Sequence, residues 1–90
     1  MQKPIKFEYT KSFVKQFSKL SPNLRQQFKN RQVLWLENPS SPILHTHPLK
    51  GRYLGYYSIN ITGDVRALYK LQGQSIVVFG FIGSHSQLYG

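Results

Sequence analysis

The chain contains no cysteine, and only 3 of its 90 residues are Asp or Glu. Without cysteine it cannot form a disulfide, a zinc-finger thiolate site or a cysteine nucleophile, and its composition suits a reducing cytoplasm. A long hydrophobic run is also absent, because no stretch of about 18 residues passes without charged or strongly polar side chains. We therefore expect a cytoplasmic protein that is neither exported nor inserted in a membrane.

Positive charge is what the chain has in excess. Its 12 Lys and Arg residues against 3 Asp and Glu give a formal net charge of +9, while 40% of the residues are hydrophobic and 14% are aromatic. That apolar content is too high for a disordered basic tail, so residues 1–90 are predicted to form a single domain with one modest core. A charge of this sign attracts polyanions. Nucleic acid is the commonest of them, with an acidic protein or an anionic membrane as the alternatives.

The first part of the sequence predicts one strand followed by two helices. Apolar and charged residues alternate over residues 5–9, which is the period of a half-buried strand. Apolar side chains then recur at helical spacing in residues 11–20: Phe13, Val14, Phe17 and Leu20. Ser21 and Pro22 suit the N-cap and first position of a second helix, which is expected to end near residues 38–39. So short a link predicts a helical hairpin.

The second half predicts a loop and then a β-meander. Residues 38–48 are rich in Pro, Ser, His and Thr, which is typical of a loop. Three strands are expected at residues 57–62, 66–71 and 75–82, and the last is apolar throughout, as in a central strand covered on both faces. Residues 84–90 are expected to be a short tail. The order predicts an α+β fold: an N-terminal strand, a helical hairpin and a three-stranded antiparallel meander in a twisted sheet.

Side chains capable of chemistry gather in the second half of the sequence. They are His45, His47, Lys50, Arg52, Asn60, Asp64, Arg66, His85 and Tyr89. The predicted hairpin places Asn60 near Arg66, and His85 leaves the neighbouring strand where it can reach the same face. An arginine with one or two histidines and an aspartate suits phosphate chemistry, because cleavage of RNA by its own 2′-hydroxyl needs a base, an acid and a charge stabiliser.

Several of these residues also have purely structural interpretations. His47 could be a simple loop histidine, and Asp64 lies in a tight turn where aspartate is common. The H-x-H spacing does not predict a metal site, because it supplies no closed set of ligands. The lysines of the first predicted helix, among them Lys11 and Lys15, could be no more than a solvated face.

Three segments carry a family resemblance: H-P-L-K-G at residues 47–51, Y-Y-S-I-N-I-T-G-D-V-R-A-L-Y-K at residues 56–70 and I-G-S-H-S-Q-L-Y-G at residues 82–90. Together they resemble the RelE/ParE superfamily of bacterial toxins from type II toxin–antitoxin modules, nearest to the YafQ-like branch of RelE-type mRNA interferases. The resemblance implies a helical hairpin on a twisted antiparallel sheet. It also implies an endoribonuclease that enters the ribosomal A site and cuts mRNA by attack of the 2′-hydroxyl on the adjacent phosphate, with no metal or other cofactor.

The resemblance implies roles for five residues. His47, Asp64 and His85 match catalytic positions of the YafQ-like pattern, and Arg66 matches the arginine that stabilises the phosphate in RelE-type enzymes. Tyr89 matches an aromatic residue that stacks on a base. Within this set we expect His47 to be the base and His85 to protonate the leaving 5′-oxygen. Asp64 would orient a histidine or stabilise its charge.

Two positions depart from the family pattern. Asn60 stands where YafQ-like enzymes have a histidine and RelE has a lysine, and Ser58 stands at the companion lysine position of RelE. An asparagine cannot remove a proton at neutral pH, so His47 or His85 has to be the base, and Asn60 is expected to contact RNA. A ParE-like toxin that inhibits DNA gyrase by binding it is one alternative. A catalytically decayed homologue that only binds RNA is the other.

The remaining positive charge is expected to bind polyanionic partners. Lys11 and Lys15 of the first helix, together with Lys50 and Arg52, would contact phosphates of ribosomal RNA. The family and the charge imply a cognate acidic antitoxin, partly disordered when free, that covers the basic surface. The ribosome and mRNA are the other expected partners, and no membrane is expected among them.

Overall fold

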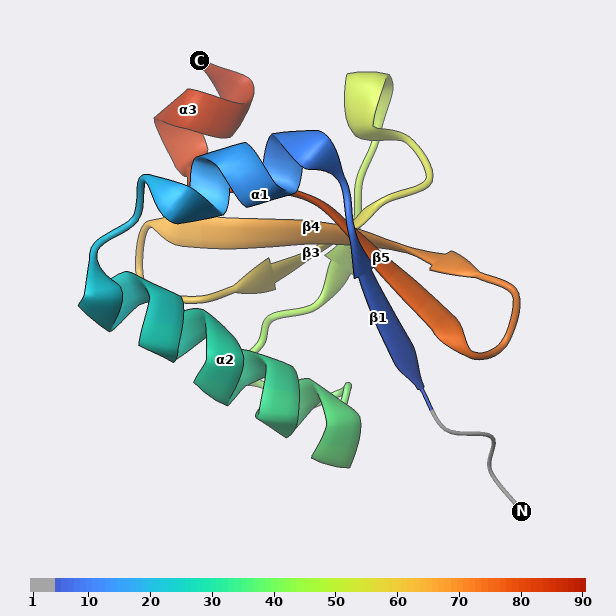
Figure 1. Cartoon of the computed structure of the whole chain (residues 1–90). Helices are drawn as coiled ribbons and strands as arrows, with labels where there is room; N and C mark the ends of the chain where they lie inside the picture. The colour runs from blue at the N-terminus through green and yellow to red at the C-terminus, as the bar shows by residue number, and fades with distance from the viewer. Residues whose placement is uncertain (1–4) are drawn as a thin grey trace.

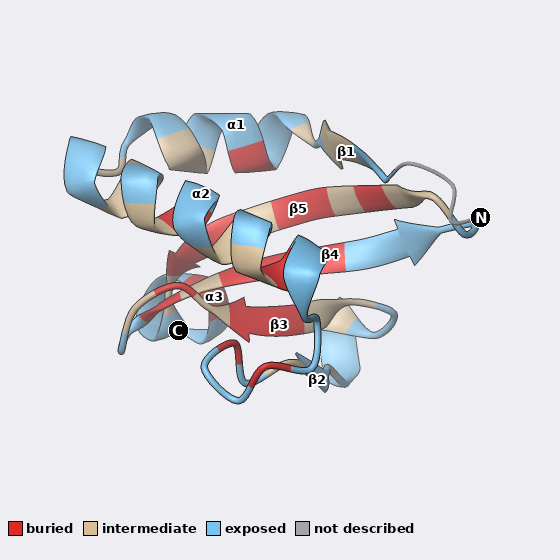
Figure 2. Ribbon diagram, turned by 90° about the horizontal axis from the view of Figure 1, so that it is seen from below, coloured by how far each residue is buried: buried red, intermediate tan, exposed pale blue. Residues whose placement is uncertain are grey.

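One mixed sheet organises the fold (Figure 1), with its strands in the order β1-β5-β4-β3-β2 (Figure 2). The structure is a computed structural model that describes residues 5–90. The strands are β1 (Lys6–Tyr9), β2 (His47–Pro48), β3 (Tyr57–Asn60), β4 (Val65–Gln72) and β5 (Ile76–Ser84). β1 runs parallel to β5, and the other neighbouring pairs are antiparallel. The predicted α+β fold, with its N-terminal strand and three-stranded antiparallel meander, is confirmed.

Two helices, α1 (Lys11–Ser18) and α2 (Pro22–Glu37), form the predicted hairpin. The Thr10 hydroxyl accepts a hydrogen bond from the backbone N–H of Phe13 at 3.1 Å, and the Ser21 hydroxyl accepts one from Leu24 at 3.2 Å. These caps satisfy amide groups that the start of a helix leaves unpaired. In the part of the chain that the structure describes, neither these helices nor any other is long and apolar enough to cross a membrane.

The first helix differs from its prediction in two respects. It ends at Ser18 rather than near Leu20, because Ser21 must already be extended to cap α2. Val14, expected on the apolar face, is 57% exposed. Successive residues of a helix are about 100° apart around its axis. Because Phe13 is buried against the sheet, the side chain of its neighbour Val14 points toward solvent.

Aromatic rings fill the space between the helices and the sheet. Phe79 of β5 is fully buried, and its ring centroid lies 5.7 Å from that of Phe13 on α1 and 5.0 Å from that of Phe28 on α2. The indole nitrogen of Trp35 donates to the hydroxyl of Tyr69 at 3.1 Å, so both buried polar groups are satisfied. Figure 2 shows buried residues on the inner strands and on the sides of α1 and α2 that face them. Both helices therefore cover the same face of the sheet.

A β-bulge in β5 changes which side chains face the helices. Two consecutive residues of β4 oppose Phe79 and Phe81, so Gly80 has no partner across the ladder. Phe81 consequently points away from α1 and α2, where its ring centroid lies 5.3 Å from that of Tyr53 and 5.7 Å from that of Tyr56. As predicted, β5 is an inner strand covered on both faces, although β4 occupies the middle of the sheet.

Replacing Gly80 with alanine is expected to lower the free energy of unfolding by about 1 kcal/mol, because the added methyl group overpacks its surroundings. A Cβ at this position would lie 2.7 Å from Cε1 of Tyr56, so the tyrosine ring would have to move. Gly63→Ala is the matched control, since a Cβ there meets no atom within 4 Å. Urea unfolding of both variants measures the difference. Equal stability of Gly80→Ala and the native chain would contradict the expected clash.

The segment predicted to be a loop contains a short strand, so that prediction was wrong at its end. His47 and Pro48 form β2 and pair with Ser58 and Tyr57 of β3 at the edge of the sheet. A proline is tolerated there because one side of an edge strand is unpaired. A strand of two residues has no detectable periodicity, and only its pairing with β3 defines it.

The predicted tail is a helix, and this prediction was also wrong. α3 (His85–Tyr89) follows β5 directly, and Leu88 on this helix is 1% exposed. Its start is a capping box, in which the Ser84 hydroxyl accepts from the N–H of Gln87 at 3.2 Å and the Gln87 side chain accepts from the N–H of Ser84 at 2.8 Å. The Ser-x-x-Gln spacing is the sequence signal that indicates this helix start.

Candidate active site

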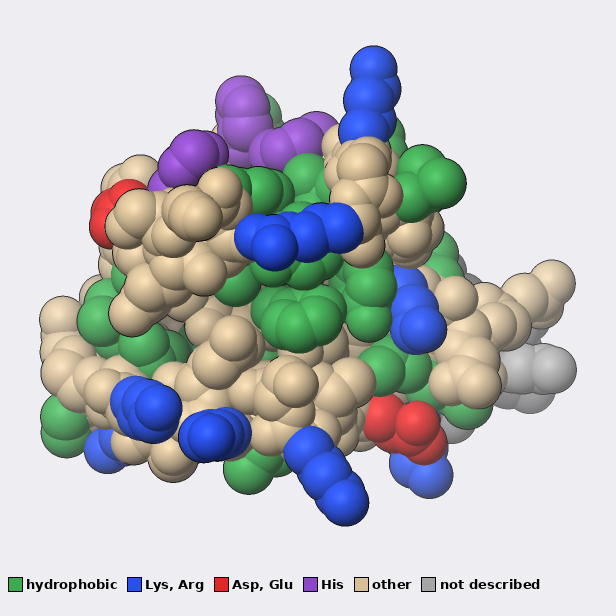
Figure 3. Space-filling view, turned by 90° about the horizontal axis from the view of Figure 1, so that it is seen from above, with side chains coloured by type: hydrophobic (Ala, Val, Ile, Leu, Met, Phe, Trp, Pro, Cys, Tyr) green, Lys and Arg blue, Asp and Glu red, His purple; other side chains and the backbone are tan. Residues whose placement is uncertain are grey.

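A pocket of about 300 Å³ opens on the sheet face away from α1 and α2. Ile59 and Ala67 belong to the core under the helices, so their neighbours on β3 and β4 face the other way. The pocket is lined by His45, His47, Leu49, Ser58, Asn60, Arg66, His85 and Tyr89. Figure 3 shows the histidine side chains gathered at one edge of the molecule. The structure thus brings together five of the predicted site residues: His47, Asn60, Arg66, His85 and Tyr89.

The register of the strands determines which side chains form the floor of the pocket. Asn60 lies opposite Arg66 in the hairpin of β3 and β4, as predicted. His47 lies opposite Ser58 because β2 pairs with β3. Residues directly opposite each other in antiparallel strands point to the same face, so all four side chains share this face of the sheet. The strand that the sequence did not predict, β2, is what carries His47 into the site.

The guanidinium group of Arg66 is anchored on one side. Its Nη1 atom donates to the carbonyl of Gly63 at 3.1 Å and, more weakly, to that of Thr62 at 3.4 Å. Both carbonyls belong to the turn between β3 and β4. Within residues 5–90 the other guanidinium N–H groups make no hydrogen bond. An arginine has five N–H donors in a planar fork, so the remaining donors are oriented and available for an anion.

His85 and Tyr89 occupy the first and last positions of α3, one turn apart. Their ring centroids lie 4.8 Å apart, as expected for side chains at i and i+4. Burial raises the pKa of the Tyr89 hydroxyl above its ordinary value, the nearby Tyr53 adds to this, and the positive charge of Arg66 opposes it. The hydroxyl is therefore protonated at neutral pH and can donate a hydrogen bond.

Two side chains outside the pocket hold α3 in place. The carbonyl of Leu88 accepts hydrogen bonds from Nη2 of Arg52 at 2.6 Å and from the hydroxyl of Tyr53 at 2.8 Å. A carbonyl in the last turn of a helix has no partner inside the helix, and a positive charge there also favours the helix dipole. Arg52, expected to contact RNA, thus has a structural contact that fixes the helix carrying His85.

Replacing Arg52 with alanine is expected to lower stability by about 1 kcal/mol, through loss of its charged hydrogen bond to Leu88. Amide hydrogen exchange should accelerate within α3 while the exchange of β4 amides stays unchanged. Lys50→Ala is the matched control, because Lys50 is exposed and lies just before the turn that contains Arg52. If α3 is equally protected in Arg52→Ala and Lys50→Ala, Arg52 does not anchor this helix.

Five of the predicted residues do not line the pocket: Arg52, which holds α3 from outside it, and Asp64, Lys11, Lys15 and Lys50. Asp64 is exposed in the turn between β3 and β4, and only its backbone approaches the site, where its carbonyl accepts from the N–H of His85 at 3.2 Å. Within residues 5–90 its carboxylate has no ion pair. Lys11 and Lys15 are exposed on α1, across the sheet, and Lys50 is exposed beside η1 (Gly51–Tyr53). Asp64 therefore contacts His85 through the backbone in this structure.

The pocket also contains two residues whose position the sequence did not reveal. His45 lines it and has a left-handed backbone, with φ of 49°. Ser58 is fully buried in the floor. The neighbouring Oδ1 of Asn60 is buried and has no hydrogen-bond partner in the described part of the chain. An acceptor in that state costs free energy unless a ligand or water pairs with it. Across residues 5–90, no three His, Asp or Glu side chains are arranged to hold a metal ion.

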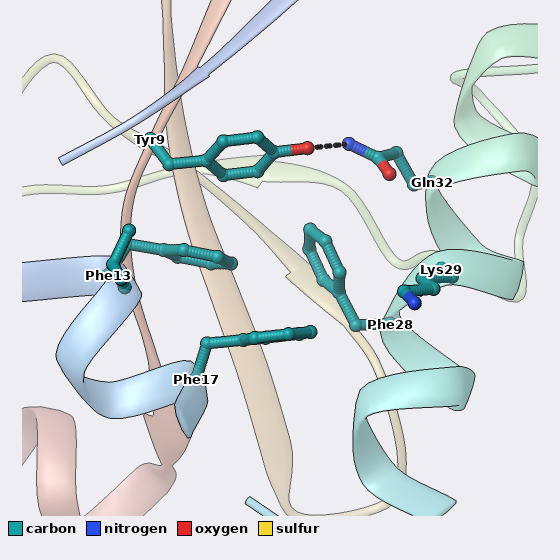
Figure 4. Close-up of a pocket in the computed structure, with 7 residues that line it drawn as sticks. Tyr9, Phe13, Phe17, Phe28, Lys29 and Gln32 are labelled. Atoms are coloured by element: carbon teal, nitrogen blue, oxygen red, sulfur yellow. Dashed lines mark hydrogen bonds between the residues drawn. The ribbon is translucent and has the colours of Figure 1, made fainter. Parts of the chain in front are cut away.

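A second hollow, of about 210 Å³, lies between β1, α1 and α2 (Figure 4). It is lined by Tyr9, Phe13, Val14, Phe17, Phe28, Lys29 and Gln32. The Tyr9 hydroxyl accepts a hydrogen bond from the Gln32 side chain at 2.7 Å across its rim. Its walls are mainly apolar, and no carboxylate or histidine lines it.

One family model matches nearly the whole chain. The model of the YafQ toxin family, described as a bacterial toxin of type II toxin–antitoxin systems, matches residues 5–90. Among solved structures, YafQ from E. coli strain BL21(DE3) is similar to this chain at 25% sequence identity and a TM-score of 0.78, and the match covers 96% of this chain and 99% of that one. No curated protein matches the chain.

Two solved complexes share the fold. The toxin of the E. coli DinJ-YafQ complex matches at 23% identity and a TM-score of 0.75, over 96% of this chain and 99% of that chain. The RelB-RelE antitoxin-toxin complex from Methanococcus jannaschii matches at 22% identity and a TM-score of 0.70, over 91% of this chain and 94% of that chain. A further similar structure is described as the E. coli DinJ-YafQ toxin-antitoxin complex.

Proposed function

Because the chain belongs to the YafQ family of bacterial toxins of type II toxin–antitoxin systems, we propose that it is an endoribonuclease that cuts mRNA in the ribosomal A site. The family match over residues 5–90 bears out the resemblance that three short segments carry. The observation that supports the enzymatic proposal is the pocket, in which Arg66, His47 and His85 meet from separate parts of the chain.

The proposed reaction is an internal transfer at one phosphodiester. His47 removes the proton of the ribose 2′-hydroxyl, and the 2′-oxygen forms a bond to the adjacent phosphorus. The bond from phosphorus to the 5′-oxygen breaks, and His85 donates a proton to that oxygen. The products are a 2′,3′-cyclic phosphate and a 5′-hydroxyl. The two imidazoles thus carry the protons, and the step calls for no metal ion.

Arg66 and Asn60 are proposed to bind the reacting nucleotide. The oriented N–H donors of Arg66 would face the phosphate as its negative charge grows, where stabilisation acts most strongly on rate. The unpaired Oδ1 of Asn60 would accept a hydrogen bond from RNA, which would satisfy this buried acceptor. Tyr89 lines the pocket and is 37% exposed, and we propose that its ring stacks on a base.

The basic surface is proposed to bind the larger partners. Lys11, Lys15 and Lys50 are exposed outside the pocket, where they would contact phosphates of ribosomal RNA in the cytoplasm. Related toxins have been solved in complex with antitoxins. A net charge of +9 favours an acidic antitoxin for this chain as well. Asp64 is proposed to support His85 through its backbone carbonyl, which accepts a hydrogen bond from the N–H of His85.

Primer extension on a translated mRNA after brief expression of the chain tests the proposal. We expect cuts in phase with codons, and none in the same mRNA after its start codon is removed. The double variant Arg66→Ala/His85→Ala serves as the inactive control. Intact mRNA with a DNA-damage response would instead indicate a gyrase inhibitor, and normal growth with intact mRNA would indicate a toxin without catalysis.

A further inference from the structure

The ring of His47 makes one hydrogen bond that determines where its proton lies. Its Nδ1 atom is 2.8 Å from the backbone carbonyl oxygen of His45. A carbonyl oxygen can only accept a hydrogen bond, so Nδ1 must carry a proton for this contact to be favourable. In the neutral imidazole the other nitrogen, Nε2, then keeps its lone pair. This is the nitrogen that can act as a base.

The carbonyl points at His47 because the backbone of His45 is left-handed. With φ of 49°, His45 is the one non-glycine residue with positive φ in residues 5–90. A Cβ atom disfavours this conformation, so the surrounding structure must impose it. The residues on both sides of His45 fix its backbone conformation. Leu44 is fully buried, and its carbonyl accepts a hydrogen bond from the N–H of Asn60 at 2.8 Å. On the other side the Thr46 hydroxyl donates to the carbonyl of Pro39 at 3.1 Å.

We propose that His45 is a positioning residue, whose left-handed backbone aims its carbonyl at Nδ1 of His47 and thereby holds Nε2 of His47 unprotonated as the base. This inference rests on the proposed function, because it specifies which atom of His47 receives the 2′-hydroxyl proton. The contribution comes from the main chain of His45. Its imidazole, although it lines the pocket with its centroid 5.6 Å from that of His47, is not required.

Variants of His45 separate the backbone from the ring. His45→Gly removes the imidazole but favours the left-handed conformation, so the carbonyl should stay in place. His45→Asn also tolerates it. His45→Val removes the imidazole and strongly disfavours positive φ, because its Cβ is branched. A catalytic imidazole at residue 45 would instead make all three variants equally slow.

The first measurement is the ring nitrogen spectrum of His47 in the full chain, labelled with ¹⁵N-histidine. We expect the neutral ring to carry its proton on Nδ1 in the native chain, in His45→Gly and in His45→Asn. In His45→Val we expect a population with the proton on Nε2. If the native ring carries its proton on Nε2, the positioning role is overturned, whatever the variants do.

The second measurement is cleavage of a translated mRNA in a reconstituted translation system. His45→Val should lower kcat by about tenfold or more, within the roughly 10²–10⁴-fold that a general base contributes, and leave KM unchanged. His45→Gly and His45→Asn should keep nearly the native kcat, because both residues accept the left-handed backbone. Circular dichroism checks that each variant is folded. If His45→Val does not fold, His45→Ala, whose penalty at positive φ is smaller, replaces it.

The two proposals fail in different ways. A native chain with the expected His47 tautomer that cuts no RNA overturns the proposed enzymatic function alone. A chain that cuts RNA although His47 carries its proton on Nε2 overturns the positioning role alone. Equal loss of kcat in His45→Gly and His45→Val also overturns it, because the imidazole would then be the active part of His45.

Discussion

Replacing Arg66 with alanine is expected to slow mRNA cleavage by about 10²–10³-fold, the usual effect of removing one donor that stabilises a growing negative charge. The structure anchors Nη1 of Arg66 on the carbonyls of Thr62 and Gly63, which orients the rest of the guanidinium group in the pocket. The loss should appear mainly in kcat, because the phosphate gains charge in the transition state. Single-turnover cleavage in a reconstituted translation system measures it.

Two controls show whether the fork of Arg66, rather than its charge alone, is responsible. Arg66→Lys keeps the charge but loses the planar set of donors, so we expect it to be slower than the native chain by about tenfold. Lys70→Ala removes a charge from the same strand, β4, outside the pocket. It should cut at the native rate. A fully active Arg66→Ala variant would remove Arg66 from the mechanism.

Replacing His85 with alanine is expected to lower the cleavage rate by about 10²–10⁴-fold, because the leaving 5′-oxygen would depart without a proton. The fold should tolerate the change. His85 is exposed at the start of α3, and alanine is the strongest helix former. Ser86→Ala, one position further along the same helix and outside the pocket, is the matched control and should remain active.

The chemical role of His85 can be separated from a structural one by changing the leaving group. An mRNA with sulfur in place of the 5′-oxygen at the cut site needs no proton on its leaving group. The His85→Ala variant should therefore cut this substrate at nearly the native rate, whereas Arg66→Ala should stay slow on it. If sulfur does not rescue His85→Ala, His85 is not the acid. In cells, the double variant Arg66→Ala/His85→Ala should be produced without growth arrest.

Most elements of the fold could be predicted because their signals are local. Ser21 caps α2 as its position in the sequence predicts, Thr10 likewise caps α1, and apolar alternation marks the strands. The prediction missed β2, which is too short for a period of its own. It also missed α3, although Ser84 and Gln87 form a capping box. The capping signal is present in the sequence, but a helix of five residues is too short to show a helical periodicity.

The family resemblance pointed to His47, Arg66, His85 and Tyr89, whereas residue spacing alone predicted only the part of the candidate site that depends on hairpin register. Asn60 opposite Arg66 follows from the two strands and the turn between them. The place of His47 depends on β2, and the exclusion of the Asp64 side chain from the pocket depends on the orientation of the turn. The left-handed backbone of His45 could not be predicted from the sequence, because histidine is enriched at positive φ but, like other non-glycine residues, adopts it at only a small share of its positions.

By itself, the sequence determined the excess of positive charge, the absence of cysteine chemistry, the helical hairpin and the meander. These follow from composition and from spacings of a few residues. Only the tertiary structure decided that β1 pairs in parallel with β5, that His47, Arg66 and His85 share one pocket, and which nitrogen of His47 carries a proton. The strand pairing and the pocket join residues far apart in the chain, and local periodicity carries no information about which distant partner a strand will meet. The His45 carbonyl is only two residues from His47, but its direction depends on a backbone conformation that the contacts of Leu44 with Asn60 and of Thr46 with Pro39 impose.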